Sequence, residues 1–318
     1  MVRGADGKWT CGPACTPWST DPACRPQDTT CPSRNPVLPA TAVKVATEVD
    51  YAGTAPHPLL FSRSYRSSGV LAFVESGHWS HWTHSFARRI ETHPDTGYTA
   101  APASVVREDG SLRNYRLLSG PRVVPPAEGT TPSTAQVQVP WVAAMEGDRN
   151  QLVELRDVHG RRVGFRYTVA EDDSVENYDA QGRLLTIRDR NGWTTRLIYS
   201  TTTTSAAIAP RAGLLIEVRN HFGMALGLRY DAQGRLTEMH PPGSPAGRPA
   251  GVNAPVRYTA TLLPSPQAGS TGLGRLDQVL SQEGRTRRFH YENSALPFGL
   301  TGITDEAGVR VGTYAYDA

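Results

Sequence analysis

The sequence lacks three kinds of segment, and each absence excludes a class of protein. No apolar run approaches the roughly 18 residues that a membrane-spanning helix needs. The 33 basic residues are nearly balanced by 30 acidic ones and form no block, so the electrostatic footprint of a nucleic-acid-binding protein is missing. The opening stretch, MVRGADGKWTCGPAC, lacks the apolar core of a signal peptide. We therefore expect no membrane span, no nucleic-acid partner and no classical export signal.

Cysteine is also scarce, and its 4 residues all lie near the start of the chain, at Cys11, Cys15, Cys24 and Cys31. Their spacing lacks the C-x2-C pairs of zinc knuckles. Two disulfides are the favoured interpretation for this proline-rich leader if the chain reaches an oxidising compartment. A disordered leader with free thiols is the alternative.

Methionine is rare at 4 residues, whereas glycine (30) and proline (25) are abundant. This balance favours many short strands and turns over helices. A hydrophobic content of 38% over 318 residues is enough for a packed core, in one large domain or two. We expect an all-β fold.

The most regular feature is an internal repeat with the pattern L-x-x-[VIL]-x-[D/N/S]-x-x-G-x6-Y. It occurs in full at residues 152–167, 184–199, 215–230 and 276–291, and in part from Leu300, where the last tyrosine is out of step. Apolar residues alternate with period two before and after each glycine, which predicts two strands with one buried face. Aspartate and glycine suit the first and last positions of the intervening turn. Each unit is therefore predicted to be a β-hairpin.

The stretch YDAQGRL occurs twice, at residues 178–184 and 230–236, and contains a further D-x-x-G turn. This inter-unit turn would join one hairpin to the next, giving a continuous antiparallel meander. The closing tyrosines are interpreted as packing groups. The predicted structural residues are Asp157, Gly160, Tyr167, Tyr178, Asp179, Gly182, Asp189, Gly192, Tyr199, Gly223, Tyr230, Asp231, Gly234, Gly284, Tyr291, Asp305 and Gly308.

Composition divides the chain into four parts. Residues 1–34 are the cysteine- and proline-rich leader, 35–120 a β-rich module, 121–150 a linker or long loop, and 151–318 the repeats. A proline- and glycine-rich insertion at 241–275 interrupts the repeats and contains one plausible strand, VRYTATLL. The insertion is interpreted as a surface excursion from the sheet.

One histidine cluster could in principle carry chemistry. His78, His81 and His84 are spaced by three, which on a helix would place them on one face and could bind zinc. Their Trp- and Thr-rich context favours a strand or loop, where that spacing puts neighbours on opposite faces. We therefore predict no metal site, no cofactor and no catalytic residue.

Taken together, these motifs resemble the YD repeats of Rhs proteins, a bacterial polymorphic toxin family related to the Tc toxin cocoon and to teneurins. Three stretches also resemble the module that precedes Rhs repeats: residues 35–51, which contain NPV and TAVKVATEVDY, LLFSRSYRSS at 59–68 and HWTHSFARRI at 81–90. In the family, the repeats wind into a hollow β-shell around a toxic C-terminal domain, and the inner face of the sheet lines a cavity.

The resemblance implies a non-catalytic shell segment, secreted or at the cell surface by a non-classical route. Its implied partners are the remainder of the shell, a C-terminal toxin domain and the secretion apparatus. Five units, without a toxin domain or the family's self-cleaving aspartyl element, lead us to expect a truncated or partial chain. Two alternatives stay open: a glycan-binding module that uses exposed rows of tyrosine and arginine, Tyr199 and Tyr230 among them, and a metal hydrolase built on the histidine cluster.

Overall fold

The computed structural model describes residues 2–3, 9–10, 37–38, 43–54, 56–68, 79–92, 102–117, 137–243, 254–263 and 273–316. These residues form strands and turns, which confirms the all-β prediction. Within these ranges no helix is long and apolar enough to cross a membrane. The four cysteines and His78 lie outside the described residues.

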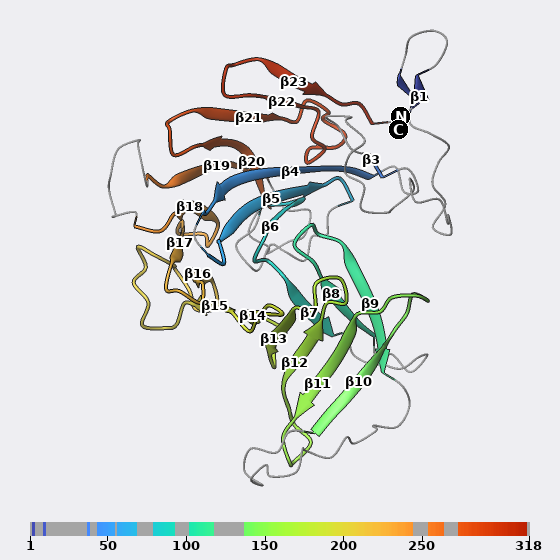
Figure 1. Cartoon of the computed structure of the whole chain (residues 1–318). Coiled ribbons are helices and arrows are strands. Elements are labelled where there is room, and N and C mark those ends of the chain that lie inside the picture. Colours follow the sequence, from blue (N-terminus) through green and yellow to red (C-terminus); the bar gives the residue numbers. More distant parts are fainter. Residues whose placement is uncertain are drawn as a thin grey trace.

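One long antiparallel sheet dominates the fold (Figure 1). Each of its strands pairs with the next one along the chain, so the sheet is a meander. Its strands are β7 (Arg89–Thr92), β8 (Pro102–Val106), β9 (Leu112–Leu117), β10 (Val137–Ala143), β11 (Gln151–Arg156), β12 (Arg162–Thr168), β13 (Val175–Asp179), β14 (Leu184–Arg188), β15 (Thr194–Tyr199), β16 (Leu215–Arg219), β17 (Ala225–Tyr230), β18 (Leu236–His240), β19 (Val256–Leu263), β20 (Leu273–Leu280), β21 (Thr286–His290), β22 (Gly302–Thr304) and β23 (Arg310–Thr313).

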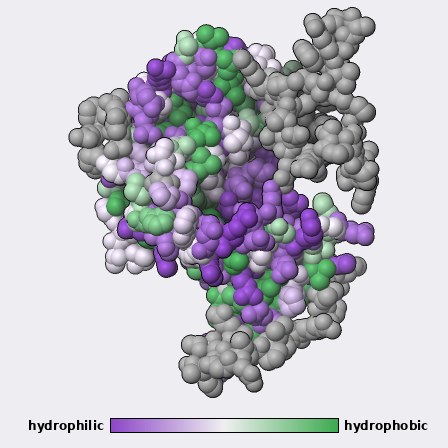
Figure 2. Space-filling model, in the orientation of Figure 1, coloured by the Kyte–Doolittle hydropathy of each residue, from purple (hydrophilic) through white to green (hydrophobic). Residues whose placement is uncertain are grey.

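A smaller sheet consists of β3 (Val37–Leu38), β4 (Val43–Ala52), β5 (Leu60–Arg66) and β6 (Trp82–His84). A separate pair is formed by β1 (Val2–Arg3) and β2 (Trp9–Thr10). In Figure 1, β4 and β5 run beneath β19–β23. Buried aromatic side chains from both sheets belong to the same core, and the visible outer surface is mainly hydrophilic (Figure 2).

The repeat units are hairpins, as predicted: β11–β12, β14–β15, β16–β17, β20–β21 and β22–β23. Their turn glycines have positive φ, from +77° at Gly160 to +88° at Gly223. Only glycine adopts this conformation without a steric cost. The inter-unit turns have the same geometry, with φ of +80° at Gly182 and +78° at Gly234.

Two parts of the sheet differ from the sequence predictions. The stretch 121–150, predicted to be a linker or loop, contains β10, because Val139 and Trp141 alternate inward and are buried. Pro140 obscured that pattern, but the last pair with β9 is Trp141 with Leu117, so the missing N–H of Pro140 leaves that ladder intact. The strand predicted inside the insertion is confirmed as β19, which pairs with β18 and β20 within the sheet instead of leaving it.

The first YDAQGRL turn closes part of the meander into a ring. Arg89 in β7 forms an isolated antiparallel bridge with Arg183, just before β14. The Ile90 N–H donates to the Gly182 carbonyl at 2.9 Å. The strand sequence β7 to β14 therefore returns to its own first edge, which covers main-chain groups that would otherwise be open to pairing with other chains.

This closure requires glycine at 182 for two reasons. Its φ is positive, and a Cβ there would lie 1.8 Å from the Ile90 carbonyl oxygen. Gly160 has a similar φ of +77°, but a Cβ there would have nothing within 4 Å. Substituting alanine at each position therefore separates the free-energy cost of the left-handed backbone, present at both, from the cost of the steric clash, present only at Gly182.

We predict that Gly160→Ala lowers the free energy of unfolding by about 1–2 kcal/mol, the cost of left-handed backbone. Gly182→Ala should cost on the order of 1–3 kcal/mol more, because β7 must move away from the turn. Urea denaturation of both variants measures the difference. Equal losses would show that the ring closure contributes nothing to stability.

Candidate functional site: the repeat unit and its inner face

Three aspartate turns are held by the same set of hydrogen bonds, which includes one from an arginine side chain. In the first YDAQGRL, Asp179 Oδ1 accepts the N–H groups of Gln181 and Arg183 at 3.0 and 2.8 Å. The Arg183 Nε–H donates to Asp179 Oδ2 at 2.7 Å. The pairs Asp157 with Arg161 and Asp231 with Arg235 repeat this arrangement. The carboxylate thus satisfies turn N–H groups and also positions the arginine that follows glycine.

The closing tyrosines return to the leucine that begins their own unit. The hydroxyl of Tyr199 donates to the Leu184 carbonyl at 2.8 Å. The same bond joins Tyr230 to Leu215, Tyr291 to Leu276 and, in the partial fifth unit, Tyr316 to Leu300, at 2.7, 2.8 and 3.0 Å. Tyr316 is one position out of step in sequence, yet it makes the equivalent bond. Tyr230 belongs to the buried core, Tyr199 and Tyr291 pack against it, and their hydroxyls form hydrogen bonds as well.

Three of the leucines that receive these bonds, Leu184, Leu215 and Leu276, lie at β-bulges. Tyr178 pairs with Leu184, but the preceding pair is Asn177 with Thr186, so Leu185 is left without a partner. The same register shift occurs at Leu215 and at Leu276. A bulge disrupts the ladder locally and bends and twists the strand. The tyrosine hydroxyl supplies a donor to the carbonyl at that irregular point.

We predict that Tyr230→Phe lowers the free energy of unfolding by about 1–2 kcal/mol, because the change leaves the buried Leu215 carbonyl without its donor. Tyr199→Phe should cost less, because Tyr199 is only partly buried and water can replace its hydroxyl. Chemical denaturation of the two single variants tests this order, and a larger loss at Tyr199 would contradict it.

A buried carboxylate stands inside the ring formed by β7–β14. Glu176 in β13 is fully buried and pairs with Arg88 and with Arg107, the latter at 2.7 Å, and it also accepts the Tyr178 hydroxyl. Burial alone would raise the pKa of the Glu176 carboxyl, but the two guanidinium groups outweigh it and hold the pKa below its ordinary value of 4.5. These two ion pairs join the segments next to β7 and β8 to β13, the strand between units one and two.

The lowered pKa predicts how stability depends on pH. The stabilisation from ionised Glu176 is fully present above its unfolded pKa, near 4.5, and is lost as pH falls through the lower folded value. Glu176→Gln should therefore cost roughly 3 kcal/mol at pH 7 by leaving the arginines without their carboxylate. The gap to the parent chain should narrow as pH falls below 4.5. Denaturant titrations from pH 7 to acid check this; a constant gap would contradict it.

The module packs on the inner face of β19–β22 through aromatic contacts. The Trp82 ring lies 4.8 Å from Phe289, and its Nε1–H donates to the Tyr291 hydroxyl at 2.9 Å. Trp79 contacts Tyr258 at 4.8 Å between ring centroids. The resemblance implied an inner face that lines a cavity; over these strands the face is instead covered, because Trp79 and Trp82 bury their rings against it.

One buried ion pair lies between the two sheets. Arg63 donates from Nε and Nη2 to Asp50 at 2.6 and 2.9 Å, and the Tyr258 hydroxyl donates to the same carboxylate at 2.9 Å. The Arg63 guanidinium also lies 5.1 Å from the Trp82 ring centroid. A charge pair removed from water in this way requires its partners, so this contact fixes how the module sits on the repeats.

The hairpin between β4 and β5 reaches the repeat turns at His57, a non-glycine residue with φ of +52°. Its Nε2 lies 2.9 Å from the Thr195 hydroxyl, and its carbonyl accepts the Asn220 side-chain N–H at 2.8 Å. Asn220 stands where units one, two and five have aspartate, and its Oδ1 still accepts the Phe222 and Met224 N–H groups. An aspartate could make the turn but could not donate to His57, which accounts for asparagine here.

The two described histidines of the cluster, His81 and His84, stack on different aromatic rings. His81, with φ of +64°, stacks on Phe298 at 5.6 Å, and His84 stacks on Phe61 at 5.0 Å. Burial lowers the pKa of both imidazoles, that of His84 to about 3. In the described ranges no group of three or more His, Cys, Asp or Glu side chains could hold a metal ion.

The glycan-binding alternative predicted exposed tyrosines. Tyr230 is buried, with 6% of its surface exposed, and its hydroxyl is used by Leu215. That expectation is wrong for Tyr230, because the tyrosines face the core and not the solvent.

Two known families match segments of the chain. Residues 34–115 match a domain of unknown function (DUF6531), which covers the module as far as β9. Residues 211–248 match the family described as RHS Repeat, which covers unit three and the second YDAQGRL. The chain contains an Rhs repeat. No curated protein sequence matches it.

Several solved structures are similar to this Rhs-repeat chain at low identity. The TcdB2-TccC3 crystal structure is 14% identical over 87% of this chain, with a TM-score of 0.42, and the Photorhabdus luminescens Tc holotoxin pore is 11% identical over 85%, at 0.41. The N-terminal domain of effector protein SpvB from Salmonella typhimurium strain LT2 is 11% identical over 80%, at 0.36. The chain spans 16% of the first structure's length and 15% of the second's.

Proposed function

We propose that this Rhs-repeat chain is a structural, non-catalytic segment of a toxin-associated shell that encloses or presents an effector. The observation that carries the proposal is that a repeat unit makes its main stabilising hydrogen bonds within itself. A unit forms its hairpin, satisfies its bulged leucine with its own tyrosine and continues into the next unit through an aspartate turn. A sheet built in this way grows by adding similar units, which suits the wall of a large container.

The titratable groups support a structural role. Glu176, Asp50 and their arginines are paired in the interior, and the tyrosine hydroxyls are committed to main-chain carbonyls. These groups hold strands together and do not converge on a shared cleft. We propose the same division of the chain as before: a leader at 1–34, a module at 35–120 and the repeats at 151–318. The module nevertheless contributes β7–β9 to the long sheet of the repeats.

The proposed partners are the remainder of the shell, a C-terminal toxin domain and the export apparatus. The proposed location is outside the cell or at its surface. Both follow from the Rhs repeat match at 211–248 and from the family resemblance.

Protease protection in the complete protein, expressed from its own gene, tests enclosure. We expect trypsin to spare a passenger segment in the native protein and to cleave it once mild denaturant opens the sheet, as read by mass spectrometry of the fragments. A passenger digested equally fast in both states contradicts enclosure. A complete product with no passenger and no co-purifying polypeptide contradicts it as well.

A further inference from the structure

The turns of units two and three carry two aromatic side chains at the surface. Trp193 follows Gly192, and Phe222 precedes Gly223; their ring centroids lie 5.3 Å apart with an interplanar angle of 73°. Phe222 is 53% exposed. Trp193 is half-buried. Large aromatic side chains dominate cores and interfaces because they bury much apolar area, so an exposed Phe222 beside a half-buried Trp193 on adjacent turns marks a contact surface.

The same surface is rigid before any ligand binds. The Trp193 N–H donates to Asp189 Oδ1 at 2.9 Å, and its carbonyl accepts the Asp189 N–H at 3.0 Å. The edge of the Trp193 ring packs on His57, 5.8 Å between centroids. The Phe222 N–H donates to Asn220 Oδ1 at 3.0 Å. Binding therefore needs little ordering of the backbone that carries these rings.

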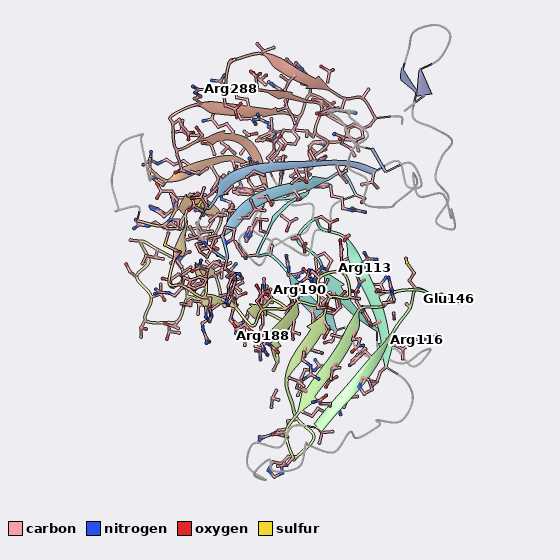
Figure 3. All side chains as sticks on the ribbon, viewed as in Figure 1. Arg113, Arg116, Glu146, Arg188, Arg190 and Arg288 are labelled. Atoms are coloured by element: carbon pink, nitrogen blue, oxygen red, sulfur yellow. The ribbon has the colours of Figure 1, made fainter. Side chains whose placement is uncertain are left out.

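Two arginines flank the rings. Arg188 ends β14 and Arg190 lies in the turn itself, both exposed and both projecting from the region of β14 (Figure 3). The Arg188 guanidinium rests on the turn, because a Cβ at Gly192 would lie 3.5 Å from its Nη2. Neither arginine forms an ion pair with a described residue. The nearby Asp189 carboxylate is occupied by turn N–H groups and lies 3.5 Å from His57 Nδ1.

We propose that this rim patch, defined as Arg188, Arg190, Trp193 and Phe222, binds an acidic sugar. The face of a single aromatic ring accepts the apolar face of a sugar ring, while a few well-placed polar groups fix the orientation of the sugar. The planar guanidinium fork matches a carboxylate better than a hydroxyl. Aromatic rings beside cations that have no ion-pair partner among the described residues thus select a sugar carboxylate, as in sialic or uronic acid. The inference does not depend on the shell function.

Isothermal titration calorimetry on the full chain tests the proposal with 3′-sialyllactose, digalacturonate and lactose. Sialyllactose and digalacturonate distinguish a sialic acid from a uronic acid source, and lactose lacks the carboxylate. We expect at least one of the two acids to bind, and lactose to bind at least about tenfold more weakly, the size of one charged hydrogen bond. No binding by either acid, or equal binding by lactose, overturns the proposal.

Four variants locate the site. Phe222→Ser and Arg190→Gln should each weaken binding of the acidic sugar by about tenfold. Val158→Ser, at the position in the unit-one turn that matches Arg190, should leave binding unchanged, since this exposed side chain belongs to a different turn. Arg288→Gln, on β21, should also leave binding unchanged, since Arg288 is exposed and lies far from Arg188 and Arg190 in Figure 3. Thermal unfolding confirms that all four variants are folded. Equal losses in the control variants, or none in Phe222→Ser and Arg190→Gln, overturn the assignment.

Discussion

The sheet depends on a bulge at the first leucine of a unit and on the tyrosine that completes it. Bulges bend and twist strands, so a long meander that coils needs them at regular intervals. Leu184, Leu215 and Leu276 each sit at a register shift, and each carbonyl receives a tyrosine hydroxyl. Leu152 pairs regularly, and Tyr167 contacts the Tyr115 hydroxyl instead. Bulge and tyrosine bond therefore occur together at these three leucines, where a phenylalanine in place of the tyrosine would leave the bulged carbonyl without this donor.

Side chains of the module form hydrogen bonds with the tyrosines and main chain of the repeats, in addition to packing against them. Trp82 donates to the hydroxyl of Tyr291, which in turn donates to Leu276. The Tyr65 hydroxyl accepts the Leu300 N–H and donates to the Phe298 carbonyl. The two motif sets visible in the sequence thus meet in space. Because these contacts join residues far apart along the chain, the module and the later repeats can complete their folding only together, and slowly.

The sequence-based predictions succeed where the cause is local. Period-two alternation and D-x-x-G turns predicted the hairpins and β19, since both depend on neighbouring residues. The ring closure through Gly182 and Ile90 could not be predicted, because nothing local distinguishes Gly182 from Gly234. β10 was not predicted because it contains Pro140. A proline is tolerated in this strand only because the pairing with β9 ends at Trp141, which the sequence does not reveal. Asn220 was a usable signal for the His57 contact: asparagine in place of aspartate adds a donor that the turn itself does not need.

The repeated YDAQGRL can now be explained letter by letter. Tyrosine meets the bulged leucine, aspartate binds the turn N–H groups, and glycine takes the positive φ. Arginine has two contacts in the first copy: Arg183 donates to Asp179 and lies 5.3 Å from the Tyr199 ring centroid, which links the turn to the next tyrosine. A lysine has no planar fork with which to bind the carboxylate and stack at once. The chain accordingly uses arginine throughout its repeats, and its lysines, Lys8 and Lys44, lie outside them.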